Sequence, residues 1–257
     1  MILDPTRPRE LGALFADSLR VYFANFARFL AIGAAVVVPT QLIVSGIGLG
    51  RLSGGFEAKQ RAADQLIGGA VQTLVATPLI VAMCVYVVLD LAAEKPPSLR
   101  RAMQAGLDAF APIFLPVLIS VACEAAIVLA VLLPAVVLGA PALTVLLLGV
   151  VFLAVRWYFI AQSVVVDNER GLDALRASWS LTTGFGWRVL GVVVLGYLAF
   201  GLGATLVASP LTAAARSADS SALLLASEIV TASLAAPAVA LLSVLVYFDL
   251  KARRTGL

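Results

Sequence analysis

Six long apolar runs constrain this chain more than any other feature of its sequence. They cover approximately residues 29–50, 66–93, 110–138, 142–166, 187–208 and 222–250. A transmembrane α-helix needs about 20 consecutive apolar residues, so each run is long enough to cross a bilayer. Charged residues make up only 13% of the chain, whereas soluble domains carry about 25%. The sequence therefore predicts an all-α membrane protein with six transmembrane helices.

Three amphipathic segments accompany these runs. Residues 11–29 and 98–110 each place apolar side chains on one helical face and charged side chains on the other, and residues 172–182 carry a weaker stripe of the same kind. Such helices lie in the membrane interface, with the apolar face toward the acyl chains. Because each segment leads into an odd-numbered run, we expect three hairpins, each preceded by an interfacial amphipathic helix.

The even-numbered runs suggest an internal repeat. Pro78 and Asp90 in the second run are twelve residues apart, as are Pro237 and Asp249 in the sixth. Residues 1–257 are therefore expected to form a single integral membrane domain with a pseudo-threefold repeat. The three copies would cover about 8–93, 98–166 and 171–250.

The distribution of Lys and Arg predicts the orientation. With six spans both termini lie on one side of the membrane, and 14 of the 18 Lys and Arg residues fall on that side, counting Arg156 within the fourth run. The other side carries Arg51, Lys59, Arg61 and Arg216. Because basic loops stay in the cytoplasm, we expect a bacterial cytoplasmic (inner) membrane protein with cytoplasmic N- and C-termini. This topology explains the net charge of +3, so no nucleic-acid partner is expected.

The chain contains no histidine. This excludes Ser–His and Cys–His nucleophilic catalysis and any zinc or haem held by histidine. Cys84 and Cys123 lie within apolar runs without CxxC spacing, so we expect them to pack as small apolar residues. No catalytic residue, metal or cofactor is predicted. An intramembrane enzyme with Glu124 or Asp90 as acid or base is the least favoured alternative.

Four polar side chains within the apolar runs form a candidate intramembrane site: Glu124, Glu228, Gln41 and Gln72. Polar groups at such depth are functional candidates, and Glu124 and Glu228 fall at a similar depth in the outer half of the membrane, counted at 1.5 Å per residue. Hydrogen bonding between helices is the first interpretation of these residues. A shared polar pocket is the second, and it would suit proton coupling in a transporter.

Arg156 has two interpretations as well. Its side chain could extend to the lipid phosphates, or it could form an ion pair with Asp90 at the inner end of the second run. Basic and aromatic residues at the predicted interface are candidate contacts for lipid headgroups. They are Arg20, Arg28, Arg100, Arg101, Arg176, Arg188, Trp179 and Trp187.

Two stretches carry a resemblance to a known family. They are Arg9-Glu10-Leu11-Gly12 through Tyr22-Phe23-Ala24-Asn25-Phe26, and Gly171 through Trp179 followed by Gly184 and Trp187-Arg188. These stretches resemble the membrane domain of glycerophosphoryl diester phosphodiesterases and the YciC-like bacterial membrane proteins. The resemblance implies a membrane domain without an assigned activity of its own. In some members it is fused to a soluble phosphodiesterase domain, whose catalysis requires histidines that this chain lacks.

These observations predict a non-enzymatic multi-pass bacterial membrane protein that binds or organises lipids, or binds a membrane partner. The expected partners are anionic membrane lipids, together with a membrane protein or further copies of the chain. The alternative is a small transporter or lipid translocator with an intramembrane polar cavity near Glu124 and Glu228.

Overall fold

The computed structural model describes residues 8–47, 62–138 and 140–255, and all secondary structure within these residues is helical. The elements are α1 (Leu11–Ala24), α2 (Phe26–Ile47), α4 (Ala62–Val71), the π-helical turn η1 (Gln72–Ala76), α5 (Thr77–Ala92), α6 (Leu99–Leu138), α7 (Ala140–Arg156), α8 (Ile160–Asp167), α9 (Leu172–Thr182), α10 (Gly186–Ser217) and α11 (Ser221–Thr255). Arg51, Lys59 and Arg61, which contribute to the predicted orientation, lie outside the described residues.

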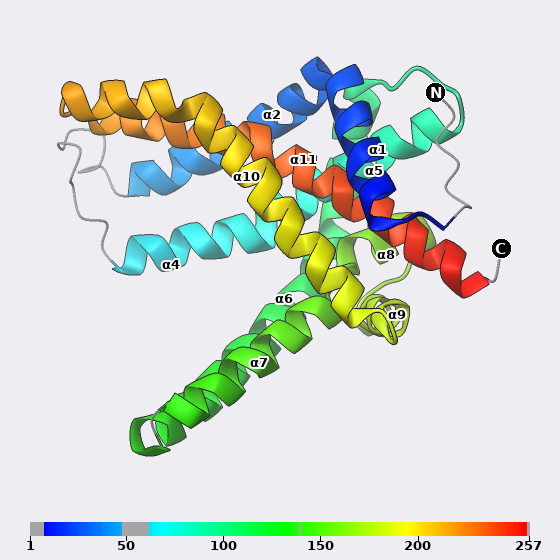
Figure 1. Cartoon of the computed structure of the whole chain (residues 1–257), viewed down its shortest axis with the longest axis vertical. Coiled ribbons are helices and arrows are strands. Elements are labelled where there is room, and N and C mark those ends of the chain that lie inside the picture. Colours follow the sequence, from blue (N-terminus) through cyan, green and yellow to red (C-terminus); the bar gives the residue numbers. More distant parts are fainter. Residues whose placement is uncertain (1–7, 48–61, 139, 256–257) are drawn as a thin grey trace.

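Six helical segments among the described residues are long and apolar enough to cross a membrane. They are Phe26–Val44, Leu66–Ala92, Leu99–Ala130, Leu143–Asp167, Gly186–Ser217 and Ser221–Thr255. The prediction of an all-helical, multi-pass membrane protein is confirmed at this level. Residues 8–10 lie beside the end of α11 (Figure 1), as an even number of spans requires. The side of the membrane that this end faces stays a prediction.

Helix α11 forms the centre of the bundle. Of its most apolar stretch, 61% is buried inside the protein, against 11% of the most apolar stretch of the span Leu143–Asp167. Helices α1, α2, α5 and α10 all pack on α11, which crosses the middle of the molecule in Figure 1. Its residues from Pro237 to Leu250 are buried without interruption. A helix that is apolar on all sides is expected in such a central position.

Pro237 interrupts the backbone hydrogen bonding near the centre of α11. Proline has no N–H, so the carbonyl of Ser233 loses its partner within the helix. Gly33 of α2 packs directly against this carbonyl, and a Cβ at Gly33 would also lie 3.0 Å from Cγ of Pro237. The absence of a side chain at Gly33 thus allows α2 to approach the part of α11 that proline has opened.

Two further side chains reach the same region of α11. The hydroxyl of Tyr22, from α1, donates a hydrogen bond of 2.9 Å to the carbonyl of Leu234. The thiol of Cys84, from α5, donates to the carbonyl of Pro237 at 3.8 Å. Burial raises the pKa of Tyr22 to about 12, so its hydroxyl stays protonated as a donor at physiological pH. The amphipathic helix α1 is therefore anchored to the bundle by a specific polar contact.

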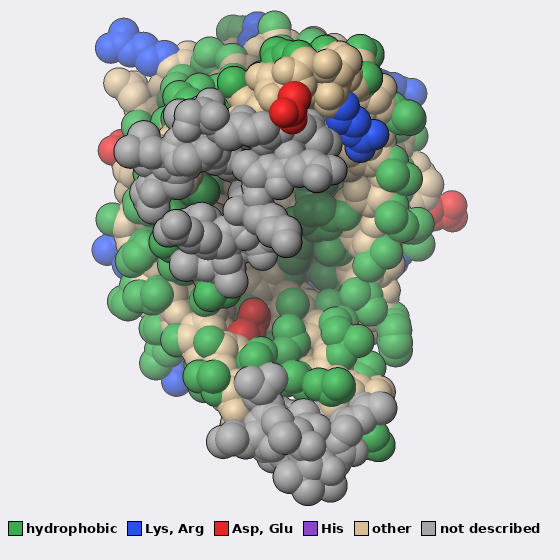
Figure 2. Space-filling model, turned by 90° about the vertical axis from the view of Figure 1, so that its left-hand side faces the viewer, with side chains coloured by type: hydrophobic (Ala, Val, Ile, Leu, Met, Phe, Trp, Pro, Cys, Tyr) green, Lys and Arg blue, Asp and Glu red, His purple; other side chains and the backbone are tan. Residues whose placement is uncertain are grey.

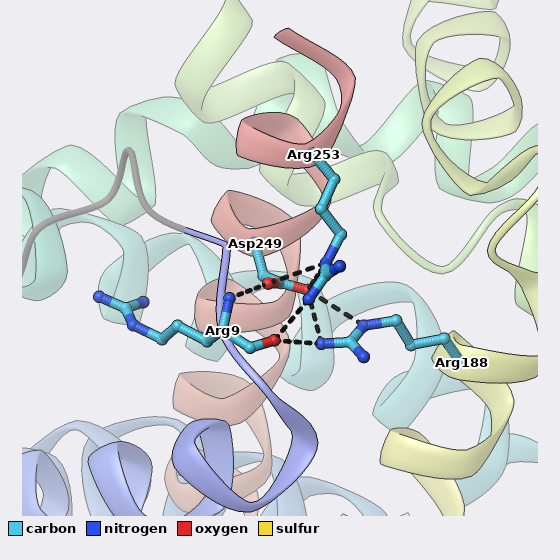
Figure 3. Close-up of polar contacts among 4 residues, drawn as sticks. All are labelled: Arg9, Arg188, Asp249 and Arg253. Atoms are coloured by element: carbon cyan, nitrogen blue, oxygen red, sulfur yellow. Dashed lines mark hydrogen bonds and ion pairs between the residues drawn. The ribbon is translucent and has the colours of Figure 1, made fainter. Parts of the chain in front are cut away.

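Asp249 ties three separate parts of the chain together (Figure 3). Its carboxylate is completely buried and accepts hydrogen bonds from Arg188 of α10 at 3.0 Å and from Arg253 at 3.1 Å. The backbone N–H of Arg9 donates to the same carboxylate at 2.6 Å. Both guanidinium groups also donate to the carbonyl of Arg9. Arg188 is thus paired with Asp249 and keeps only 20% of its side chain exposed, so its role as a lipid-headgroup contact stays a prediction.

The predicted interfacial helices are separate elements in two of three places. Asn25 ends α1 before α2. Gly184, between α9 and α10, has a backbone φ of +85°, which residues other than glycine rarely adopt. The second amphipathic segment instead continues without interruption into its span, because α6 is one helix of 40 residues. No comparable turn residue interrupts α6, so a separate second interfacial helix is not formed. The threefold repeat stays a prediction.

The hairpin of α6 and α7 diverges from the hairpin of α10 and α11. Figure 1 shows their far ends pointing away from one another, while the end of α7 and the start of α10 lie beside α9. Helix α7 packs mainly on α6. Figure 2 shows the molecule from the left-hand side of Figure 1, away from the N- and C-terminal ends. The described surface on this side is mainly apolar and hollowed. This divergence leaves space among the spans for the cavity described next.

Candidate intramembrane site

The fourth span is broken, and the break places several side chains of the candidate site. Helix α7 ends at Arg156 and α8 begins at Ile160. The hydroxyl of Ser178, from α9, donates to the carbonyl of Arg156 at 2.8 Å and accepts from the N–H of Phe159 at 3.1 Å. A break at membrane depth is tolerated only where the freed backbone groups find such partners. Helix α9 therefore holds the turn from which α8 starts in a new direction.

A π-helical turn interrupts the second span. Pro78 has no N–H, so the carbonyl of Leu74 lacks its usual partner four residues on. The N–H of Thr77 bonds instead to the carbonyl of Gln72, five residues back. Such π-turns are rare and often occur at functional sites. This one places Gln72 and Thr77 side by side, with the amide of Gln72 3.5 Å from the hydroxyl of Thr77.

A cavity of about 430 Å³ lies among five of the six spans. The span Phe26–Val44 contributes nothing to its lining. Its walls are mostly apolar, and its volume is in the range of sites for small molecules. Six residues provide most of its polar groups: Gln72, Ser120, Glu124, Gln162, Tyr197 and Ser243. No Lys or Arg of the described chain lines it, so its charge comes from acidic groups alone.

Glu124, on α6, is the carboxylate of this cavity. It is half-buried, and within residues 8–47, 62–138 and 140–255 its carboxylate has neither a hydrogen bond nor an ion pair. A carboxylate without a partner among apolar side chains costs free energy. Its position therefore indicates a group with a role beyond holding helices together.

Gln162, on α8, has a hydrogen-bonding group that nothing in the described chain satisfies. Its side chain is only 1% exposed, and its Nε2 donates to the hydroxyl of Ser243 at 3.0 Å. That hydroxyl already donates to the carbonyl of Ala240 at 2.7 Å, so it accepts from Gln162 and fixes the orientation of the amide. The opposite atom, Oε1, is buried without a partner. Gln162 thus offers an unused acceptor beside the cavity.

The structure brings together two of the four predicted intramembrane residues. Glu124 and Gln72 both line the cavity, whereas Glu228 and Gln41 do not. Gln41 belongs to α2, whose span lies outside the lining. Glu228 lies one helical turn beyond Ala232, the first α11 residue to line the cavity, a separation of about 6 Å along the helix axis. A pocket shared by all four residues is therefore not formed.

The predicted ion pair between Asp90 and Arg156 is wrong. Asp90 pairs with Arg101 at 3.0 Å, because the short connection between α5 and α6 brings the start of α6 back to the end of α5. Arg156 lies over the ring of Trp179, 5.2 Å from its centroid, and donates to Thr183 at 3.0 Å. This cation–π contact holds Arg156 and Trp179 together at the point where α7 ends.

The other candidate headgroup contacts differ in their surroundings. Arg101 is paired with Asp90, and Arg176 pairs with Asp173 at 3.0 Å on an exposed face. Trp187 is 87% exposed, as expected for an aromatic residue that contacts lipid headgroups. The remaining exposed arginines of the predicted set are Arg20, Arg28 and Arg100. These three arginines and Trp187 are exposed without an ion pair among the described residues.

Sequence reasoning missed Gln162, Ser243 and Tyr197 as cavity residues. Gln162 could have been found, because it is a polar residue within the fourth apolar run, the same signal that singled out Gln41 and Gln72. Ser243 and Tyr197 gave no such signal, since serine and tyrosine are tolerated at many places in membrane helices. Their contribution depends on which helix faces point inward.

No protein-family model, curated protein or solved structure matches this chain. The resemblance to the phosphodiesterase membrane domain and the YciC-like proteins therefore stays a prediction. No group of three or more Cys, Asp or Glu side chains among the described residues is arranged to hold a metal ion. The geometry of the cavity is accordingly the main guide to function.

Proposed function

We propose that this multi-pass membrane protein is non-enzymatic and binds an amphiphilic molecule of the membrane in the cavity among its spans. The cavity itself carries this proposal: it has mostly apolar walls, a few polar groups and a volume of about 430 Å³. Sites for small molecules combine these features, with the polar groups fixing the orientation of the ligand. An acyl chain suits the apolar walls, and a polar headgroup suits Glu124 and Gln162.

The surroundings of the cavity support entry from the bilayer. Thr77, Ala154 and Tyr197 line the cavity and are also exposed on the surface of the protein. All three belong to segments long and apolar enough to span the membrane, so the proposal places their exposed surface against acyl chains. A lipid translocator or small transporter would use the same cavity, and binding is the first step of either activity. Because Glu228 does not line the cavity, we propose binding without a carboxylate pair.

Filling the cavity should abolish this binding. Gly201 lines the cavity, and a Cβ there would meet open space, so Gly201→Phe is expected to place its ring in the cavity without disturbing the helix. Native mass spectrometry of the purified protein, with detergent removed at increasing activation, should show lipid retained by the natural protein and about tenfold less by the variant.

Gly203→Phe is the matched control for this experiment. Gly203 is on the same helix two residues away, a Cβ there would also meet open space, and it does not line the cavity. We expect the control to retain lipid as the natural protein does. Equal retention by all three proteins would refute binding in the cavity.

We further propose that the end of the bundle carrying the termini contacts anionic lipid headgroups, and that it faces the cytoplasm of a bacterium. The exposure of Arg20, Arg28 and Arg100, together with that of Trp187, supports this second role. The largely unburied span Leu143–Asp167 leaves room for a membrane partner or a second copy of the chain. Both roles involve lipid, but they concern different parts of the protein.

The double variant Arg20→Gln/Arg100→Gln tests the second role. Each basic residue near an anionic surface contributes about 1 kcal/mol, so we expect roughly thirtyfold weaker retention of phosphatidylglycerol, measured by lipid exchange in mixed micelles. Arg216→Gln, which removes a positive charge at the opposite end of the bundle, should have little effect. If the double variant and Arg216→Gln lose the lipid equally, the two arginines form no specific contact surface.

A further inference from the structure

We infer that the cavity selects a lipophilic amine, with Glu124 receiving its cationic ammonium head and Gln162 accepting a hydrogen bond from it or from a neighbouring polar group. This inference rests on the proposed function, because it names the chemical class of the amphiphile that the cavity binds. Three properties of the lining carry it: its charge, its unused acceptors and its aromatic side chains.

The charge of the cavity favours a cation. Glu124 lines it without an ion-pair partner in the described chain, and no described Lys or Arg contributes to the lining. A carboxylate in apolar surroundings is stabilised by an opposite charge and destabilised by another negative charge. A fatty acid, or an anionic phosphate headgroup that carries no amine, would be repelled by Glu124, whereas an ammonium group would neutralise it.

The unused hydrogen-bonding capacity favours a donor. The Oε1 atom of Gln162 is buried and unpartnered, and the contact of Nε2 with Ser243 prevents the amide from turning round to donate there. The hydroxyl of Ser120 donates to the carbonyl of Val117 at 2.8 Å, so it too offers an acceptor to the cavity. An ammonium group carries three N–H donors and no acceptor, which complements this lining.

The aromatic side chains and the apolar walls favour an organic cation over a metal ion. Trp157, Tyr158 and Tyr197 line the cavity, and the faces of such rings attract organic cations. Metal ions such as Ca²⁺ require six to eight oxygen ligands, which these mostly apolar walls do not supply. The volume of about 430 Å³ leaves space for part of an alkyl chain beside the head.

Dodecylammonium is the probe for this inference, used with the full chain purified in an uncharged maltoside detergent. Its binding is measured by equilibrium dialysis beside two probes of equal chain length, the neutral dodecanol and the anionic dodecanoate. We expect the natural protein to bind dodecylammonium at least tenfold more tightly than either. Glu124→Gln should remove about tenfold of that affinity, a moderate value because Glu124 is only half-buried.

Glu228→Gln is the matched control, since Glu228 is also a carboxylate of a membrane span but does not line the cavity. It should bind dodecylammonium as the natural protein does. A Glu124→Asp variant, which keeps the charge, should recover part of the affinity, showing that charge rather than folding is responsible.

The outcomes separate this inference from the proposed function. If all three probes bind equally and Gly201→Phe abolishes their binding, the cavity binds amphiphiles but the preference for an amine is refuted. If no probe binds, or if Gly201→Phe changes nothing, both the inference and the proposed function fail. If Glu124→Gln loses affinity for dodecylammonium but not for dodecanol or dodecanoate, both the inference and the proposed function are supported.

Discussion

Replacing Asp249 by Asn is expected to lower the free energy of unfolding by about 3 kcal/mol, the lower part of the range for breaking a buried ion pair. The carboxylate is completely buried, while the side chains of Arg188 and Arg253 are 20% and 29% exposed. Removing its charge leaves two guanidinium groups facing each other without a counter-ion. The lower part of the range applies because water partly screens both arginines.

The same substitution should also release the start of the chain. The backbone of Arg9 hydrogen-bonds to Asp249 and to both guanidinium groups. The side chain of Asp249 therefore joins the start of the chain, α10 and the end of α11 (Figure 3). Unfolding by a denaturing detergent measures the loss. Asp173→Asn is the control, because the side chains of Asp173 and Arg176 are both exposed. This ion pair should contribute less than about 0.5 kcal/mol. Equal losses in the two variants would contradict a central role for Asp249.

Replacing Gly33 by Ala is the second substitution with a large expected effect. The added methyl group would collide with the backbone carbonyl of Ser233 and contact the ring of Pro237. A backbone carbonyl in the central helix cannot move aside as a flexible side chain can. Overpacking of this kind costs about 3 kcal/mol at the upper end of its usual range, and helix α2 would be forced away from α11.

Gly191→Ala provides the comparison for Gly33. Gly191 is also inside a membrane-spanning helix, but a Cβ there would meet open space. Alanine should therefore stabilise that helix by about 0.5–1 kcal/mol, the usual difference between the two residues in a helix. Resistance to unfolding by denaturing detergent measures both variants. If Gly33→Ala were as stable as Gly191→Ala, close packing of α2 on the opened backbone would be wrong.

Much of the fold could be predicted from the apolar runs, because the length of a transmembrane helix is set by the thickness of the bilayer. The turn between α9 and α10 was likewise predictable from Gly184. The continuous helix α6 was not, since the amphipathic pattern of residues 98–110 describes which faces are polar and does not reveal whether a helix ends. The break after Arg156 was also hidden, because it depends on Ser178 from another helix.

The candidate site could be predicted only in part. Position within the apolar runs suggested Glu124 and Gln72, which line the cavity, yet depth also suggested Glu228, which lies a turn away from it. The pairing of Arg156 with Asp90 failed for a related reason, as the sequence gives no information about which of several arginines lies nearest. Exposed fraction and the direction of a side chain depend on packing among helices, which one sequence does not specify.

The central claim is that the cavity holds a membrane amphiphile. Cryo-electron microscopy of the protein in nanodiscs of bacterial lipid, with a bound antibody fragment to aid alignment, tests it most directly. We predict elongated density between the side chains of Glu124 and Gln162 and the exposed rim at Tyr197, and its absence in Gly201→Phe. A cavity that contains only water-sized density in the natural protein, or the same density in both proteins, would contradict the claim.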